Sequence, residues 1–228
     1  MNGARKAVLC VMIALILLIG MQAGSHAATS MELSLWDLEN SPIVVVDNGA
    51  GDLNLTVGAI TFIGPIGKWN VNVTTGVTYP ALGTTDTPKM DLNSVNISST
   101  GPATLLLGLS ALGYTLTPGE ASFHVGGTTD GFVSVEAFSG DIGSYFDTAN
   151  SLGGAMTFSP PAFLGSVNGA VPVLPNPYSL SILAEIGHGE GGGSTSFDAN
   201  LAVPEPTTLL FLGFGLVGLV GMRRKFQE

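Results

Sequence analysis

Two histidines and several serines are the side chains from which a hydrolytic site could be built in this chain of 228 residues. A catalytic serine of the α/β-hydrolase type sits on a sharp turn with the pattern G-x-S-x-G, and the sequence contains no such pattern. His124 falls on the polar side of an alternating stretch and His188 falls in a glycine-rich stretch, so we expect both imidazoles to be solvated. We therefore predict that the protein is not an enzyme, and the shortage of histidine and cysteine disfavours a zinc site.

The segment DNGAGD, from Asp47 to Asp52, has the oxygen-rich composition of a calcium-binding loop. An EF-hand loop needs oxygen ligands at its third and fifth positions, and here those positions are Gly49 and Gly51. A turn between two strands, with Asn48 and Gly49 as a positive-φ pair, explains the segment better. We expect no metal and no cofactor, while a surface calcium held by several acidic residues stays open as an alternative.

Aromatic side chains could stack on sugar rings if two or three of them were exposed in a row. Alternation with Val71 favours a core position for Trp69. A row of exposed rings would separate a carbohydrate-binding or adhesive module from a structural domain. The tryptophan and tyrosine residues that could take part are Trp36, Trp69, Tyr79, Tyr114, Tyr145 and Tyr178.

The elements that must position these residues are predicted to be β-strands, because apolar and polar residues alternate with a period of two. Glycine-rich turn sequences separate about ten to twelve such stretches, which is typical of an antiparallel β-sandwich or jelly roll. Residues 43–46 and 104–109 are predicted to be strands buried on both faces, and residues 140–155 are the one candidate for a short helix. The side chains predicted to share inward faces are Trp69, Val71 and Val73; Ala121, Phe123 and Val125; Val133, Val135 and Ala137; Leu180, Ile182, Ala184 and Ile186; and Thr195, Phe197, Ala199, Leu201 and Val203.

Charge is distributed very unevenly along the chain. Residues 28–203 hold 15 acidic residues and 2 lysines, a net charge of −13. Binding to a nucleic acid depends on lysine and arginine that displace the counterions condensed on the phosphates. This composition therefore excludes nucleic acid as a partner.

The first 27 residues have the layout of a secretory signal peptide. Arg5 and Lys6 precede an apolar run from Ala7 to Met21, and Ser25 and Ala27 place small residues at three and one positions before a cut after Ala27. This layout predicts export by the Sec machinery and cleavage by signal peptidase, which would remove the only cysteine. An uncleaved membrane anchor is the alternative, although the run is short for a span.

The C-terminal end combines an extended segment, an apolar run and a basic cluster. Residues 207–222 carry no charge, and as a helix they would span about 24 Å. This is shorter than a hydrocarbon core, but the basic residues that follow can snorkel to the interface. The positive-inside rule then places the N-terminus outside and the C-terminus in the cytoplasm. The predicted basic anchor consists of Arg223, Arg224 and Lys225.

The order, spacing and position of these parts resemble the PEP-CTERM sorting signal, a tail that is sometimes labelled an ice-binding-protein C-terminal domain. The resemblance covers residues 203–228, and its motif is formed by Val203, Pro204, Glu205 and Pro206. It implies processing by an exosortase near the Pro-Glu-Pro, in a Gram-negative bacterium that makes exopolysaccharide. Both prolines lack an N–H and favour an extended chain, which suits access by a processing enzyme.

The sequence is thus expected to comprise a signal peptide at 1–27, an extracellular β-sandwich at 28–202 and a sorting signal at 203–228. The first hypothesis is an exported structural protein of the cell surface or extracellular matrix, associated with exopolysaccharide and biofilm. The second is a carbohydrate-binding or adhesive module, with or without calcium. A hydrolase is the third and weakest hypothesis.

Overall fold

The structure is a computed structural model that describes residues 30–115, 119–141 and 144–204. The predicted signal peptide with its cleavage residues Ser25 and Ala27 lies outside the described residues. So do Glu205, Pro206, the predicted transmembrane helix and the basic cluster 223–225. Within the described ranges no helix is long and apolar enough to cross a membrane.

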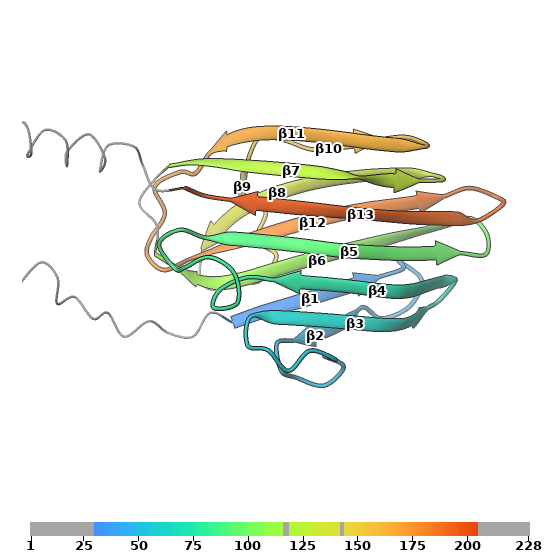
Figure 1. The fold of residues 1–228 in the computed structure, drawn as a ribbon, viewed down its shortest axis with the longest axis horizontal. Coiled ribbons are helices and arrows are strands. Elements are labelled where there is room, and N and C mark those ends of the chain that lie inside the picture. The colour runs from blue at the N-terminus through green and yellow to red at the C-terminus, as the bar shows by residue number, and fades with distance from the viewer. Residues whose placement is uncertain (1–29, 116–118, 142–143, 205–228) are drawn as a thin grey trace, which may run out of the picture.

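In the described ranges, thirteen antiparallel strands form two sheets that pack face to face (Figure 1). The first sheet has the order β10-β8-β12-β6-β1-β2, with β9 paired to β8, and the second has the order β11-β7-β13-β5-β4-β3. The strands are β1 (Ser30–Trp36), β2 (Ile43–Val46), β3 (Ala59–Ile66), β4 (Trp69–Val77), β5 (Lys89–Ser99), β6 (Ala103–Tyr114), β7 (Glu120–Thr129), β8 (Phe132–Asp141), β9 (Asn150–Ser151), β10 (Met156–Phe158), β11 (Ala162–Ala170), β12 (Tyr178–His188) and β13 (Gly193–Ala202).

Eight of these strands have the order of a double-sheet jelly roll. They run β5-β13-β7-β11 in one sheet and β6-β12-β8-β10 in the other. The chain passes between the sheets at most connections, and the last two strands insert between strands formed much earlier in the chain. Four of the remaining five strands extend the sheets at one side, where β1 and β2 continue the first and β4 and β3 continue the second, and β9 pairs with β8.

The core between the sheets includes the inward residues that alternation predicted, together with residues such as Met31, Leu33 and Ile60 for which no face was predicted. The predicted inward positions of β7, β8, β12 and β13 are all buried, from Ala121 to Val203. Trp69 is 2% exposed and lies in this core, which confirms its predicted place. Strand β6 is buried along most of its length, as expected for residues 104–109.

Three predictions about local structure are wrong. Residues 43–46 form the edge strand β2, in which Val44 and Val46 are exposed and only Val45 is buried. The described part of 140–155 contains turns and the short strand β9 but no helix. In β4 two irregularities in the pairing with β5, on either side of Val73, shift the alternation. Thr74, predicted to face outwards, is therefore fully buried.

Both described chain ends lie at the same end of the sandwich, which we call the exit end (Figure 1). Ser30 pairs with Leu112 near the end of β6, and Ala202 pairs with Ser122 near the start of β7. The opposite end, where β12 ends at His188, is called the far end. A chain anchored at its C-terminus would therefore present the far end away from the anchor.

Candidate functional site

The last strand leads into the predicted sorting motif with no spacer between them. Val203 is 1% exposed, and its N–H donates to the carbonyl oxygen of Pro88 at 2.9 Å. Pro204, the next residue, is exposed. The described part of the predicted motif therefore passes from the core at Val203 to the surface at Pro204.

Two buried tyrosines lie in the core at the exit end. The rings of Tyr114 and Tyr178 lie 5.9 Å apart, and both side chains are at most 1% exposed. The Tyr114 hydroxyl contacts the Thr78 hydroxyl, which lies at the start of the loop that leads to Pro88. Burial raises the pKa of both phenols above its usual value. Both tyrosines belong to the same hydrophobic core cluster as Val203.

His188 contradicts the expectation of a solvated imidazole, because only 6% of it is exposed. Its ring lies 4.7 Å from that of Trp69. The Ser99 hydroxyl donates to the Gly101 carbonyl and lies 2.8 Å from Nδ1, so Nδ1 carries the hydrogen and donates to Ser99. Nε2 then accepts from the Thr195 hydroxyl at 2.9 Å. The hydrogen bonds thus specify one neutral tautomer, whose pKa is lowered by burial.

This cluster differs from a hydrolytic triad in two ways. The nitrogen that faces away from Ser99 meets Thr195 and no carboxylate, and the hydroxyl hydrogen of Ser99 is directed to a backbone carbonyl. Asp130, the nearby acid, uses Oδ2 to accept from the backbone N–H and hydroxyl of Ser194. The negative charge of Asp130 raises the pKa of His188 and so offsets part of the lowering that burial causes. The cluster orients an imidazole within the far end, and the prediction that the protein is not an enzyme stays a prediction.

His124 lies on β7 and is exposed, as expected from its place in the alternating pattern. It pairs along the strands with Ser166 and Asn200. His124 and His188 therefore do not form a joint site. The structure places one on an outer face and the other in the interior.

The acidic loop after β2 uses its carboxylates to hold its own backbone. Asp47 Oδ2 accepts from the N–H of Gly58, and Asp52 accepts from the N–H groups of Asn48, Asn54 and Thr61 at 2.8–3.0 Å. Asn48 has the predicted positive φ, at 55°, whereas Gly49 does not and Gly51 does. Across the described residues, no group of three or more histidine, cysteine or acidic side chains is placed to hold a metal ion.

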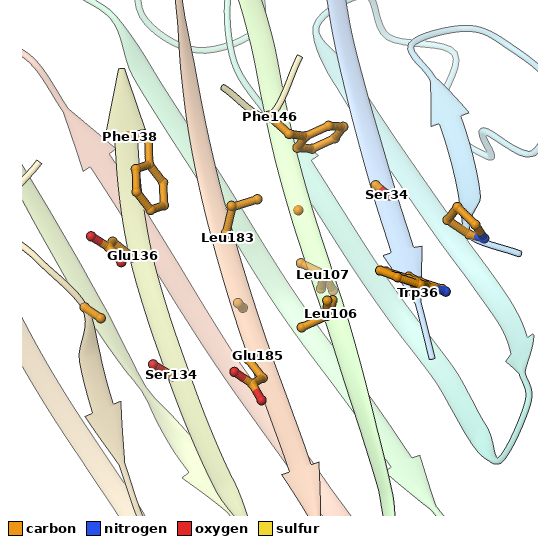
Figure 2. Close-up of a pocket in the computed structure, with 14 residues that line it drawn as sticks. Ser34, Trp36, Leu106, Leu107, Ser134, Glu136, Phe138, Phe146, Leu183 and Glu185 are labelled. Carbon is orange, nitrogen blue, oxygen red and sulfur yellow. The ribbon is translucent and has the colours of Figure 1, made fainter. Parts of the chain in front are cut away.

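The outer face of the first sheet contains a hollow of about 470 Å³ (Figure 2). Outward positions of four neighbouring strands line it, with Trp36 from β1, Leu106 from β6, Leu183 from β12 and Phe138 from β8. Trp36 and Phe138 lie on opposite sides of the hollow, with the leucines between them (Figure 2). Trp36 is 39% exposed, and its Nε1 donates to the Asn40 carbonyl at 2.7 Å, which fixes the ring at the rim.

Phe146 closes one end of this hollow from the segment that follows β8. It has a φ of 57°, a left-handed conformation that is rare for a bulky residue. Its N–H donates to the buried hydroxyl of Ser110 at 3.0 Å, and that hydroxyl lies 2.8 Å from the hydroxyl of Ser181. Gly108 makes room for the ring, because a Cβ there would lie 2.8 Å from Phe146 and 2.9 Å from Leu183.

The polar groups of the hollow are acidic or hydroxylic. Glu136 and Glu185 line it together with Ser34 and Ser134, and no lysine or arginine is among the lining residues. Glu136 accepts from the Ser151 hydroxyl at 2.5 Å, while Glu185 is exposed at the end opposite Phe146 (Figure 2). The hollow therefore combines an apolar floor and three aromatic rings with hydrogen-bond acceptors.

Of these residues, sequence reasoning singled out only Trp36. The outward positions of β8 are Phe132, Ser134, Glu136 and Phe138, so large aromatic residues occupy places that a solvated face would give to polar ones. That departure from alternation was the available signal. Phe146 had no comparable signal, because it lies in an irregular segment.

Comparison with known proteins identifies one family feature. The PEP-CTERM protein-sorting motif matches residues 202–225, which confirms the resemblance seen in the sequence and marks the chain as carrying an export and sorting signal that exosortases recognise. No curated protein matches the chain.

Several solved structures are similar to part of the chain. TmCBM61 in complex with β-1,4-galactotriose is 10% identical, covering 60% of this chain and 90% of its own at a TM-score of 0.29. A family 16 carbohydrate-binding module is 14% identical, covering 55% and 80% at a TM-score of 0.29. The PA14 sugar-binding domain from an RTX adhesin is 12% identical, covering 77% and 90% at a TM-score of 0.33. At these values the likeness says nothing about what this chain binds.

Proposed function

We propose that this chain is a structural protein of the cell surface or extracellular matrix of a Gram-negative bacterium, associated with exopolysaccharide and biofilm. The Sec machinery exports it and signal peptidase removes residues 1–27. The C-terminal helix then holds it in the membrane, with the N-terminus outside and the C-terminus in the cytoplasm. An exosortase processes it near the Pro-Glu-Pro, and the jelly roll is retained at the surface or released into the matrix.

The observation that carries this proposal is the junction at Val203. Val203 is buried and hydrogen-bonded to Pro88, and Pro204, the last described residue, is exposed. A processing enzyme needs an extended and accessible segment, and the two prolines favour one. Because the last described strand ends at Ala202, cleavage after Pro204 would leave all thirteen described strands intact.

Replacing Pro204 and Pro206 together by alanine in the native host tests this proposal. We expect the double variant to accumulate as an unprocessed, membrane-bound chain, while the wild type appears in a shorter form at the surface or in the medium. The measurement is fractionation of cells followed by immunoblotting against the sandwich. Pro102→Ala, in an exposed loop at the far end, is the matched control and should be processed as the wild type. Normal processing of the double variant would contradict the proposal.

A second function, that of a carbohydrate-binding or adhesive module, is favoured by the hollow on the first sheet. Three aromatic rings of this hollow gather on one outer face, which is the arrangement that would distinguish a binding module from a purely structural one. The calcium-assisted form of this function has no comparable support, since the oxygens of Asp47 and Asp52 accept hydrogen bonds from their own loop.

A further inference from the structure

We propose that the hollow on the outer face of β1, β6, β12 and β8 binds one sugar unit of a neutral or amino-sugar polysaccharide. The inference rests on the proposed association with exopolysaccharide and names the site and the ligand class. The volume of the hollow, about 470 Å³, falls within the range usual for small-ligand sites, about 300–1,000 Å³.

The shape of the hollow is built into the fold and does not depend on a covering element. Gly108 allows Leu183 and Phe146 to approach each other over the floor. The ring of Phe146 is held there in a left-handed backbone conformation by the hydrogen bond from its N–H to Ser110. Sparsely populated conformations of this kind persist where the surroundings impose them, and they cluster at ligand sites.

The chemistry of the hollow selects a ligand with an apolar face and hydrogen-bond donors around its edge. The faces of Trp36 and Phe138 offer apolar, polarisable surface, and the only donor of the Trp36 ring is already used by Asn40. Glu136 and Glu185, when ionised, can only accept hydrogen bonds. A sugar ring meets both demands, because its C–H groups contact an aromatic ring while its hydroxyl groups donate to carboxylates.

The charge of the hollow decides between classes of polysaccharide. Two carboxylates line it without a lysine or arginine, and residues 28–203 contain only 2 lysines against 15 acidic residues. A uronic acid or a phosphorylated sugar would meet like charge, which raises the free energy of the complex. A protonated amino sugar would gain from the same carboxylates, so affinity should rise from anionic through neutral to cationic chains.

The test uses the full-length chain in lipid vesicles that contain no other protein, and tryptophan fluorescence reports binding. The chain has 2 tryptophans, of which Trp36 is at the rim and Trp69 is in the core. Chitosan oligomers and cellopentaose are expected to shift the emission saturably, whereas polygalacturonate should not. Trp36→Ala should weaken binding about 10-fold or more, because one aromatic contact with the sugar is lost. Since this variant lacks the tryptophan at the rim, its affinity is measured by calorimetry.

A charge reversal separates this proposal from a nonspecific apolar contact. Glu185→Lys, at an exposed position, should weaken binding of chitosan oligomers and leave cellopentaose less affected. Leu164→Ala, on an exposed position of β11 in the other sheet, is the control and should bind as the wild type. Equal binding of polygalacturonate and chitosan, or unchanged binding by both Trp36→Ala and Glu185→Lys, would overturn the proposal.

The outcome is independent of sorting. A chain that is exported and processed normally but binds none of these sugars would refute the hollow as a sugar site and leave the processing proposal standing. Sugar binding by a chain that is never processed would support the hollow as a sugar site and refute the processing proposal.

Discussion

The two outer faces of the sandwich differ although their inner faces are equally apolar. The first sheet carries rings, leucines and a glycine on the outward positions of its central strands. The second sheet carries amides there, with Asn70 donating to Asn72 at 2.9 Å and Asn72 donating to Asn96 at 3.0 Å. All three asparagines are exposed. One face therefore has the composition of a binding surface and the other that of a hydrated surface.

This difference indicates that most of the stability of the jelly roll comes from the inner face of each sheet. The inner positions are filled by one continuous core, so the outer positions are available for other purposes. Outward apolar residues then call for a functional explanation, because large exposed apolar patches are uncommon on soluble domains. Truncation of an inward residue should consequently lower the free energy of unfolding much more than truncation of its outward neighbour on the same strand.

The largest contrast is expected between Ile182 and Leu183 on β12. Ile182 is fully buried in the core, so Ile182→Ala should lower the free energy of unfolding by about 2–5 kcal/mol. Leu183 is half-buried on the floor of the hollow, and Leu183→Ala should cost about 1 kcal/mol. Urea denaturation of both variants measures the difference. Equal losses would show that the outer face is part of the core.

A change of pH between 7.5 and 5 should alter stability through His188 in the interior. Burial lowers the pKa of His188, so the unfolded chain binds a proton that the folded chain does not as the pH falls below the usual value near 6.5. Stability should therefore be complete above that value and fall on acidification, with a slope of at most about 1.4 kcal/mol per pH unit for one proton. Denaturation at pH 7.5 and pH 5 provides the measurement.

Two substitutions isolate this effect from the titration of other groups. His188→Gln should flatten the dependence over that range, while Leu164→Ala, on the exposed face of the second sheet, should leave it as in the wild type. If the two variants behaved alike, the assignment of the titration to His188 would be wrong.

Removal of the support under Phe146 should have a smaller effect, confined to the outer face of the first sheet. Ser110→Ala deletes the acceptor of the Phe146 N–H, and a lost hydrogen bond of this kind costs about 1 kcal/mol. Hydrogen exchange at the Phe146 amide should accelerate, while amides of β13 in the other sheet keep their protection. Unchanged exchange at Phe146 would show that its conformation does not depend on Ser110.

The smallest effect is expected on the hydrated face. Asn72→Ala breaks the amide chain between β4 and β5, but exposed polar substitutions usually change stability by less than about 0.5 kcal/mol. The midpoint of thermal unfolding checks this. A loss as large as that from Leu183→Ala would remove the distinction between the two faces.

The fold could be predicted from the sequence wherever alternation alone fixed the environment. The inward residues of β12 and β13 are buried as expected, since a period of two leaves a strand only two choices of face. The prediction failed at Thr74, where irregular pairing reverses the faces, and at residues 43–46, where an apolar strand lies at a sheet edge. Neither feature depends on the strand's own residues alone.

The candidate sites were predictable to different degrees. The sorting signal is contiguous, so its residues could be identified by order and spacing. The hollow is assembled from four strands and a loop that are distant in the chain, and only their pairing brings Trp36 and Phe138 to one face. His188 was misplaced because its partners Ser99 and Thr195 come from the second sheet.

The measurement that tests the account most directly is the intact mass of the protein recovered from its native host. We expect a single mature form that begins at Ala28 and ends between Pro204 and the start of the apolar run, found at the cell surface or in the medium. A full-length chain of 228 residues, uncut at both ends and dissolved in the cytosol, would contradict export, anchoring and processing together.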